Sequence, residues 1–158
     1  MKRSIIIGGL ITVFLAIFMF FAFRQVTPQE IENAPDWVPI EEASQKAVND
    51  NRLILVDIYE VGCRFCRAMD REVYPSPSVR AVLDREYYPV KINGNSETTI
   101  QFQGEEITQK EFAAAMGATA FPFTVVIDAD GNIIDRRRGY MDVVGLTRFL
   151  RDATESAL

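Results

Sequence analysis

The chain of 158 residues contains no histidine, two cysteines and a single tryptophan. The lack of histidine excludes imidazole acid–base catalysis, a Cys–His nucleophile pair, haem ligation by histidine and mixed Cys/His zinc sites. Basic residues are also scarce, because 17 Lys and Arg stand against 22 Asp and Glu, and three of the basic residues precede residue 25. This acidic excess argues against nucleic acid as a partner, since phosphate binding needs a positive surface.

One long segment lacks charge altogether, from residue 4 to residue 23. As a helix, 20 residues span about 30 Å, the thickness of the apolar core of a bilayer. Lys2 and Arg3 supply the positive flank of a signal sequence or a signal anchor. Residues 20–24, Phe-Phe-Ala-Phe-Arg, lack the small residues that signal cleavage needs. We therefore expect a transmembrane signal anchor at residues 1–23 rather than a cleaved signal peptide or a buried soluble helix.

The positive flank predicts that the chain beyond the anchor leaves the cytoplasm. We expect a single-pass protein of the inner (cell) membrane, whose C-terminal domain lies in the periplasm or outside the cell, where disulfides persist. Residues 24–39 contain three prolines and several acidic side chains, which predicts a linker of at most about 50 Å. Residues 40–158 are long enough for one folded domain.

The hydrophobic pattern of that domain predicts an α/β fold, with a central mixed sheet and helices on both faces. Residues 53–59 form a continuous apolar run with one acid, which is typical of a central strand. The other expected elements are a helix at 40–49, a helix at 63–73, a helix capped by Ser78, a strand at 88–92, a hairpin at 99–107, a helix at 109–116 with a capping box of Thr108 and Glu111, a hairpin of 123–127 and 133–138, and a last helix from Asp142.

The two cysteines, Cys63 and Cys66, follow the central strand and open the next helix. Two cysteines separated by two residues at such a junction most often form a redox site. Cys63 falls in the first helical turn, where free N–H groups and the helix dipole favour a thiolate, and Arg64 and Arg67 add positive charge. Cys63 is therefore the expected nucleophile, and Cys66 would resolve the mixed disulfide.

Two other interpretations of the cysteine pair are weaker. A structural disulfide would close a very short loop and stabilise little. Half of a zinc site would lack its remaining ligands, since the sequence has no other cysteine and no histidine. We expect a redox disulfide between Cys63 and Cys66, with no metal and no cofactor.

Two further residues, Asp57 and Pro122, can each be interpreted in two ways. Asp57 lies inside the central strand, six residues before Cys63. Burial would raise its pKa and allow it to accept the Cys66 proton, but it could equally bond to the backbone at a strand end. Pro122 directly precedes the apolar run 123–127. Taken alone it indicates a strand start with a trans peptide bond, because cis bonds occur at only about 5% of prolines in folded proteins.

The strand with Asp57, the Cys63-x-x-Cys66 helix, Pro122 before a strand, and Gly139 come in the order and spacing of the thioredoxin superfamily, which residues 37–151 resemble. Residues 71–74, 104–108 and 139–142 are similar to periplasmic thioredoxins of the SoxW type and to the C-terminal thioredoxin domain of DsbD. The resemblance implies a thioredoxin fold and thiol–disulfide exchange. It makes Cys63 the attacking thiol, Cys66 the resolving thiol, Asp57 the proton acceptor and Pro122 a cis proline.

The resemblance also implies a function and partners. We expect a monomeric reductase of protein disulfides, fed by a membrane electron donor of the DsbD or CcdA kind. The expected substrate contacts are four residues: Phe121, whose backbone would pair with the substrate, and Gly62, Arg64 and Phe65 beside the cysteines. The Arg64–Phe65 pair differs from the Gly-Pro of cytosolic thioredoxins. An oxidase or isomerase stays open, as does a non-catalytic binding or assembly module, for example in cytochrome c maturation.

Overall fold

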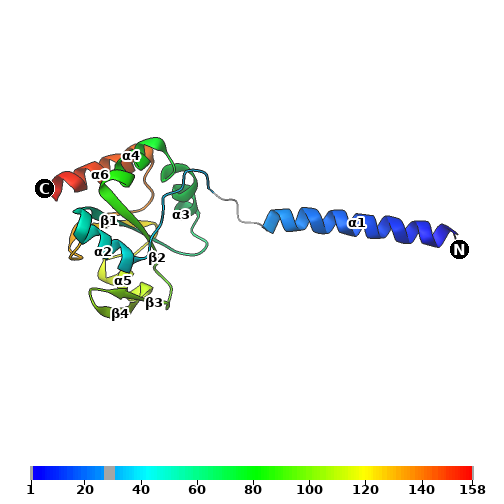
Figure 1. Ribbon diagram of the computed structural model, residues 1–158, viewed down its shortest axis with the longest axis horizontal. Coiled ribbons are helices and arrows are strands. Elements are labelled where there is room, and N and C mark those ends of the chain that lie inside the picture. Colours follow the sequence, from blue (N-terminus) through cyan, green and yellow to red (C-terminus); the bar gives the residue numbers. More distant parts are fainter. Residues whose placement is uncertain (1, 27–30, 158) are drawn as a thin grey trace. The chain divides into compact units, whose positions relative to one another are not determined.

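The computed structural model of the protein describes residues 2–26 and 31–157. Contacts along the chain divide it into two units, Met1–Glu30 and Ile31–Leu158. The first unit is a single helix, α1 (Lys2–Val26), and the second carries every other element (Figure 1).

Helix α1 exposes the side chains of residues 7–23, most of which are large and apolar. No helix within the described residues has both the length and the apolar character that crossing a bilayer demands. The signal anchor expected at residues 1–23 therefore stays a prediction.

The second unit is built on a four-stranded sheet of order β2-β1-β5-β6, which confirms the predicted mixed sheet. The strands are β1 (Leu53–Tyr59), β2 (Tyr87–Asn93), β5 (Phe123–Ile127) and β6 (Ile133–Arg138). Strand β1 pairs parallel to β2 and antiparallel to β5, which in turn pairs antiparallel to β6. The apolar run at 53–59 thus forms an inner strand, buried along its middle because helices cover both faces of the sheet.

Two apolar layers of side chains cover the two faces of the sheet. Ile54, Val56 and Ile58 of β1 pack on one side with α2 (Ile40–Asp50) and α5 (Gln109–Ala115). Leu55 packs on the opposite side. The helices of that side are α3 (Arg64–Ala68), the π-helical turn η1 (Met69–Val73), α4 (Pro77–Glu86) and α6 (Val143–Ser156). The two-residue alternation of β1 therefore sends Asp57 to the face covered by α3 and η1.

A small hairpin of β3 (Thr99–Phe102) and β4 (Glu105–Thr108) precedes α5. The predicted capping box at the start of α5 is confirmed: the Glu111 N–H donates to the Thr108 hydroxyl at 3.1 Å, and the Thr108 N–H donates to the Glu111 carboxylate at 2.8 Å. These two bonds satisfy N–H groups that the first helical turn would leave unpaired.

The helix expected at 63–73 is present, but its second half is a π-helical turn. The Tyr74 N–H donates to the Met69 carbonyl at 3.0 Å, five residues back. The predicted cap of the next helix was wrong, because α4 begins at Pro77 and its N-cap is Ser76 rather than Ser78. Proline suits the first helical position, where its missing N–H is no loss.

The predicted linker at 24–39 divides into three parts. Residues 24–26 end α1, residues 27–30 lie outside the described residues, and residues 31–39 belong to the second unit. Proline content predicted a loose connection for this last part. Composition does not reveal the tertiary hydrogen bonds that hold it.

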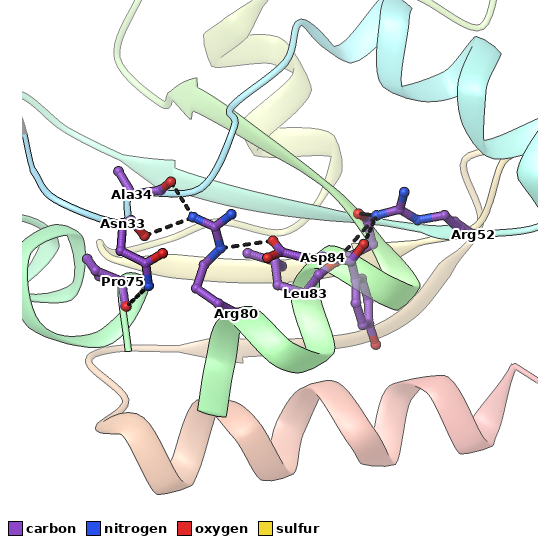
Figure 2. Close-up of polar contacts among 8 residues, drawn as sticks. Asn33, Ala34, Arg52, Pro75, Arg80, Leu83 and Asp84 are labelled. Carbon is purple, nitrogen blue, oxygen red and sulfur yellow. Dashed lines mark hydrogen bonds and ion pairs between the residues drawn. The ribbon is translucent and has the colours of Figure 1, made fainter. Parts of the chain in front are cut away.

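Arg80 of α4 makes two of those bonds (Figure 2). Its guanidinium donates to the carbonyl oxygens of Asn33, at 2.8 Å, and of Ala34. The Asn33 amide donates in turn to the Pro75 carbonyl at 2.6 Å. Figure 2 also shows Arg52 donating to the carbonyl of Asp84 near the end of α4, at 3.0 Å. The hydrogen bonds of Arg80 and Asn33 therefore hold residues 31–39 against the helical layer that covers Asp57.

Candidate active site around Cys63 and Cys66

Cys63 and Cys66 form a disulfide, and their Cα atoms are 5.3 Å apart. Cys63 is the N-cap of α3 and half-buried, whereas Cys66 is only 3% exposed. The Cys66 N–H donates to the Cys63 sulfur at 3.0 Å. When the disulfide is reduced, the same N–H and the dipole of the helix would stabilise a thiolate on Cys63. The pair thus has an accessible sulfur that can attack and a buried sulfur that can resolve.

Exposed apolar side chains lie two residues before and two residues after Cys63. Val61 is 82% exposed and Phe65 is 57% exposed, while Gly62 lies between Val61 and Cys63 with a φ of +90° that favours glycine. The Phe65 ring contacts the Tyr140 ring at 6.0 Å between centroids. This exposed apolar surface lies directly beside the disulfide.

The loop that contains Phe121 and Pro122 is connected to the same surface. The Phe121–Pro122 peptide bond is cis, the isomer that the resemblance implies. The Gly139 N–H donates to the Pro122 carbonyl at 2.8 Å, and Gly139 is followed by Tyr140, whose ring meets Phe65. The structure therefore connects Pro122 to the cysteine helix through residues 139–140.

The side chain of Phe121 turns into the domain. Its ring lies over Gly94, where an added Cβ would fall 2.5 Å from the ring Cζ atom, and it packs against the apolar layer that contains Ile58. Phe121 can therefore offer a substrate its backbone rather than its ring. The need for a glycine at position 94 follows from this ring position.

Asp57 is 1% exposed and lies across from Lys91 on β2 and from Thr124 on β5. Among the described residues, no hydrogen bond reaches either oxygen of its carboxyl group, the Tyr74 hydroxyl or the Thr124 hydroxyl, and all four atoms are buried. Burial raises the pKa of Asp57 to about 7, while the Lys91 ammonium, 3.7 Å from Oδ2, acts against this shift. A carboxyl group that titrates near neutrality can both take and return a proton.

Lys91 is itself held by several groups. Its ammonium donates a hydrogen bond to the Asp70 carboxylate of η1. The ammonium also lies over two aromatic rings, 5.0 Å from the centroid of Trp37 and 5.1 Å from that of Tyr59. The Trp37 ring meets Tyr74 edge-on at 5.1 Å. A partly buried ion pair thus lies beside the buried carboxyl group.

Sequence reasoning missed three of these residues, Lys91, Asp70 and Tyr74. Lys91 could have been found, because a lone lysine in the strand that follows the cysteine helix predicts a charge beside Asp57 once the two strands are paired. Asp70 and Tyr74 carried no such signal, since the π-helical turn that positions them is not visible in the pattern of residues. Within the described part of the chain, no three Cys, Asp or Glu side chains gather in a way that could hold a metal ion.

The fold, and the cysteine pair at the start of the helix that follows β1, define a protein with a thioredoxin-like domain. Residues 40–154 match the family model described as thioredoxin-like domain, and the chain belongs to that family.

Solved structures agree with this assignment. The DsbH oxidoreductase superposes with a TM-score of 0.62 at 17% identity, covering 82% of this chain and 90% of the other. A putative disulphide-isomerase from Bacteroides thetaiotaomicron gives 0.62 at 22% identity, covering 82% and 98%. The oxidised C-terminal domain of DsbD from Neisseria meningitidis gives 0.56 at 13% identity, covering 72% and 90%. At these identities the likeness concerns the fold.

A curated relative, an uncharacterised protein of Caenorhabditis elegans, is 22% identical over 103 residues. The match covers 65% of this chain but only 14% of that much longer protein. This relative therefore adds a shared domain and no activity.

Proposed function

We propose that the protein is a thiol–disulfide oxidoreductase that reduces disulfides in other proteins. One observation carries the proposal: a half-buried sulfur at the N-terminus of a helix is joined to a buried sulfur, and a buried carboxyl group of raised pKa lies on the same face of the sheet. Each part matches a step of dithiol–disulfide exchange.

In the first step, the Cys63 thiolate attacks one sulfur of the substrate disulfide. A mixed disulfide forms, the substrate S–S bond breaks, and the second substrate sulfur leaves as a thiolate that takes a proton from water. In the second step, the Cys66 thiol gives its proton to the Asp57 carboxylate, and the Cys66 sulfur attacks the Cys63 sulfur. The mixed disulfide breaks, and the substrate sulfur that Cys63 had attacked leaves as a thiolate that takes a proton from water. Two electrons have moved from the dithiol to the substrate.

The substrate contacts in this proposal follow from exposure. Gly62, Arg64 and Phe65 lie within two residues of Cys63, and all three are exposed. The backbone of Phe121, directly before the cis proline, is the candidate for pairing with an extended substrate strand. Its ring, packed over Gly94, would fix that backbone in place.

A chain that ends each cycle as a disulfide needs a source of electrons. A membrane electron donor of the DsbD or CcdA kind fits this need, because the proposed anchor at residues 1–23 would hold the domain near the membrane. The uncharged run at 4–23, its positive flank and the helical form of α1 support a single-pass anchor in the inner (cell) membrane. They also support a periplasmic or external domain, which we propose to act as a monomer.

The test is the reduction potential of the Cys63–Cys66 pair, measured on the full chain by equilibration with glutathione or dithiothreitol and thiol trapping. We expect a value near or below about −230 mV, in the range of thioredoxin and glutaredoxins. A value of about −120 to −180 mV would instead indicate an oxidase or isomerase.

Two cysteine variants separate an enzyme from a binding module. Cys63→Ser should abolish disulfide reduction, whereas Cys66→Ser should accumulate a mixed disulfide through Cys63. If Cys63→Ser keeps full function in a partner-binding assay and the wild type shows no turnover, a binding or assembly module is the correct assignment.

A further inference from the structure

The ammonium of Lys91 is shared unequally between two carboxyl groups. It makes a hydrogen bond with Asp70, and it lies 3.7 Å from the Oδ2 atom of Asp57, too far for one. Asp57 and Lys91 sit opposite each other on neighbouring strands, so Asp57 is the partner that the sheet itself supplies. Asp70 comes from η1, a different element, and makes the closer contact.

The surroundings of the ammonium favour this arrangement. The rings of Trp37 and Tyr59 lie over it, which restricts its movement. The Asp70 side chain is 22% exposed and keeps contact with solvent, whereas the Asp57 side chain is 1% exposed. The titratable groups that face Asp57 are thus Lys91 from β2, Asp70 from η1 and Tyr74 directly after η1.

The charges act on Asp57 in opposite directions. The Lys91 ammonium favours an ionised Asp57, while the Asp70 carboxylate opposes it, both by direct repulsion and by neutralising the ammonium. Asp70 lies in the π-helical turn, a distortion that is frequent at functional sites.

We propose that Asp70 is a positioning residue for the proton step: its carboxylate holds Lys91 away from Asp57 and thereby keeps Asp57 basic enough to take the proton of the Cys66 thiol. The proposal rests on the proposed function only for the identity of the proton donor. Its electrostatic part concerns three side chains and can be measured without turnover.

The experiment is an NMR titration of the aspartate carboxyl carbons in the oxidised full chain, in which the signal of Asp57 is the one lost in Asp57→Asn. In Asp70→Asn, we expect the titration midpoint of Asp57 to fall by about one pH unit, because one opposing charge is removed. Asp70→Glu should restore the wild-type midpoint. An unchanged or higher midpoint in Asp70→Asn overturns the proposal.

The matched control is Glu72→Gln. Glu72 lies in the same π-helical turn, is exposed, and has no ion pair within the described residues. Its neutralisation removes the same charge from the same turn and should leave the Asp57 midpoint in place. If Asp70→Asn does not fold, Asp70→Ser removes the same charge with a smaller side chain.

A second pair of variants tests the route through Lys91. Lys91→Met should raise the Asp57 midpoint, and Asp70→Asn should lower it less in that background than in the wild type. Equal shifts in both backgrounds would mean that Asp70 does not act by holding Lys91, which overturns the positioning role.

The proton step itself is read from the pH dependence of mixed-disulfide resolution in the wild type and in Asp70→Asn. The rate profile should move in the same direction as the Asp57 midpoint. If the titration midpoint of Asp57 shifts in Asp70→Asn while the pH dependence of the resolution rate does not, the proposed proton transfer from Cys66 to Asp57 is overturned. A total lack of reductase turnover in the wild type would refute the proposed function and leave the titration result standing.

A separate observation concerns the surface around the disulfide. Exposed arginines lie on the helical segment that begins after Cys63, and none of them pairs with a carboxylate among the described residues. They are Arg64, Arg67 and Arg71 on α3 and η1. This basic rim belongs to a chain with an excess of acidic residues.

We infer that the redox partner presents an acidic segment beside its disulfide. The apolar surface of Val61, Phe65 and Tyr140 would receive the residues next to the partner's cysteine, and the free guanidinium groups would attract the flanking carboxylates. This inference also rests on the proposed function, and its test is a ratio of two rates, in which changes in overall activity cancel.

The test uses two synthetic peptides, each with one disulfide, that differ only in Glu or Gln at the flanking positions. We expect the reduced full chain to react about tenfold faster with the Glu peptide at low salt, and salt should remove the difference. Replacing Arg67 and Arg71 by Gln should reduce the ratio, whereas Gln at Arg148 and Arg151, two exposed arginines of α6, should not. Equal rates for the two peptides at low salt would overturn the inference.

Discussion

Replacement of Asp57 by asparagine should make the oxidised domain more stable at neutral pH. Burial raises the pKa of Asp57 in the folded chain from 3.8 to about 7. Between these values the folded state holds a proton that the unfolded state has lost, so the stability of the wild type falls as the pH rises through this window. The full penalty, present above about pH 7, amounts to about 4 kcal/mol.

Asparagine has nearly the same shape and does not ionise, so the variant is free of this penalty. We therefore expect the two proteins to differ little near pH 4, and Asp57→Asn to be more stable by up to about 4 kcal/mol at pH 8. The difference between the two pH values is the diagnostic quantity, since any change in packing contributes equally to both.

The assay is urea unfolding of the oxidised full chain, followed by tryptophan fluorescence at a series of pH values. Trp37 is the only tryptophan and packs against Tyr74 in the second unit, so its emission reports the unfolding of the domain that holds Asp57. A wild-type stability that stays level from pH 4 to pH 8 would refute the reasoning. So would an asparagine variant that gains nothing over this range.

The remaining predictions concern packing and capping. Gly94→Ala should lower the free energy of unfolding by about 2 kcal/mol, because its Cβ would lie 2.5 Å from the Cζ atom of the Phe121 ring. Thermal unfolding measures this loss. In a second variant that also carries Phe121→Ala, the smaller side chain should relieve the clash. A stable Gly94→Ala chain would mean that the ring can swing away at no cost. Thr108→Ala should lower the stability by about 1 kcal/mol through loss of the cap of α5, and an unchanged urea midpoint would show that the cap is dispensable.

Most of the sheet could be predicted from the sequence because its strands are locally unambiguous. The run 53–59 is apolar throughout, and the hairpin of β5 and β6 is marked by Asp130–Gly131, where Gly131 has the expected positive φ of +82°. Thr108 and Glu111 likewise predicted the start of α5, since a capping box involves residues only three apart. Each of these signals lies within a few neighbouring residues, and interactions between such neighbours are sufficient to define the element that the signal predicts.

Features that depend on contacts distant in sequence were not visible. Residues 31–39 looked like a linker, yet Arg80, more than forty residues later, holds their carbonyl groups. The cis bond before Pro122 followed from the resemblance alone, because residue preferences favour trans.

The same limit applies to the candidate site. The cysteines and Asp57 carried recognisable signals, but the charges that tune Asp57 come from β2 and η1, and only the folded chain brings them together. Burial of Asp57 could be expected from its strand. The competition of two carboxylates for Lys91 could not be expected from the sequence. It depends on the distance of 3.7 Å from Lys91 to Asp57 and on the hydrogen bond from Lys91 to Asp70.

The energetics of Asp57 argue for a chemical role. A residue that lowers the stability of its domain by about 4 kcal/mol at neutral pH takes up a large share of the 5–15 kcal/mol that a typical domain possesses. An asparagine or an apolar residue at the same position in β1 would avoid the loss. Lys91 could reduce the penalty by moving closer, yet Asp70 and two aromatic rings hold it back. A strand that retains an acid under these conditions keeps a group that can exchange a proton at neutral pH, and proton exchange with the buried sulfur of Cys66 is the step of disulfide reduction that needs one.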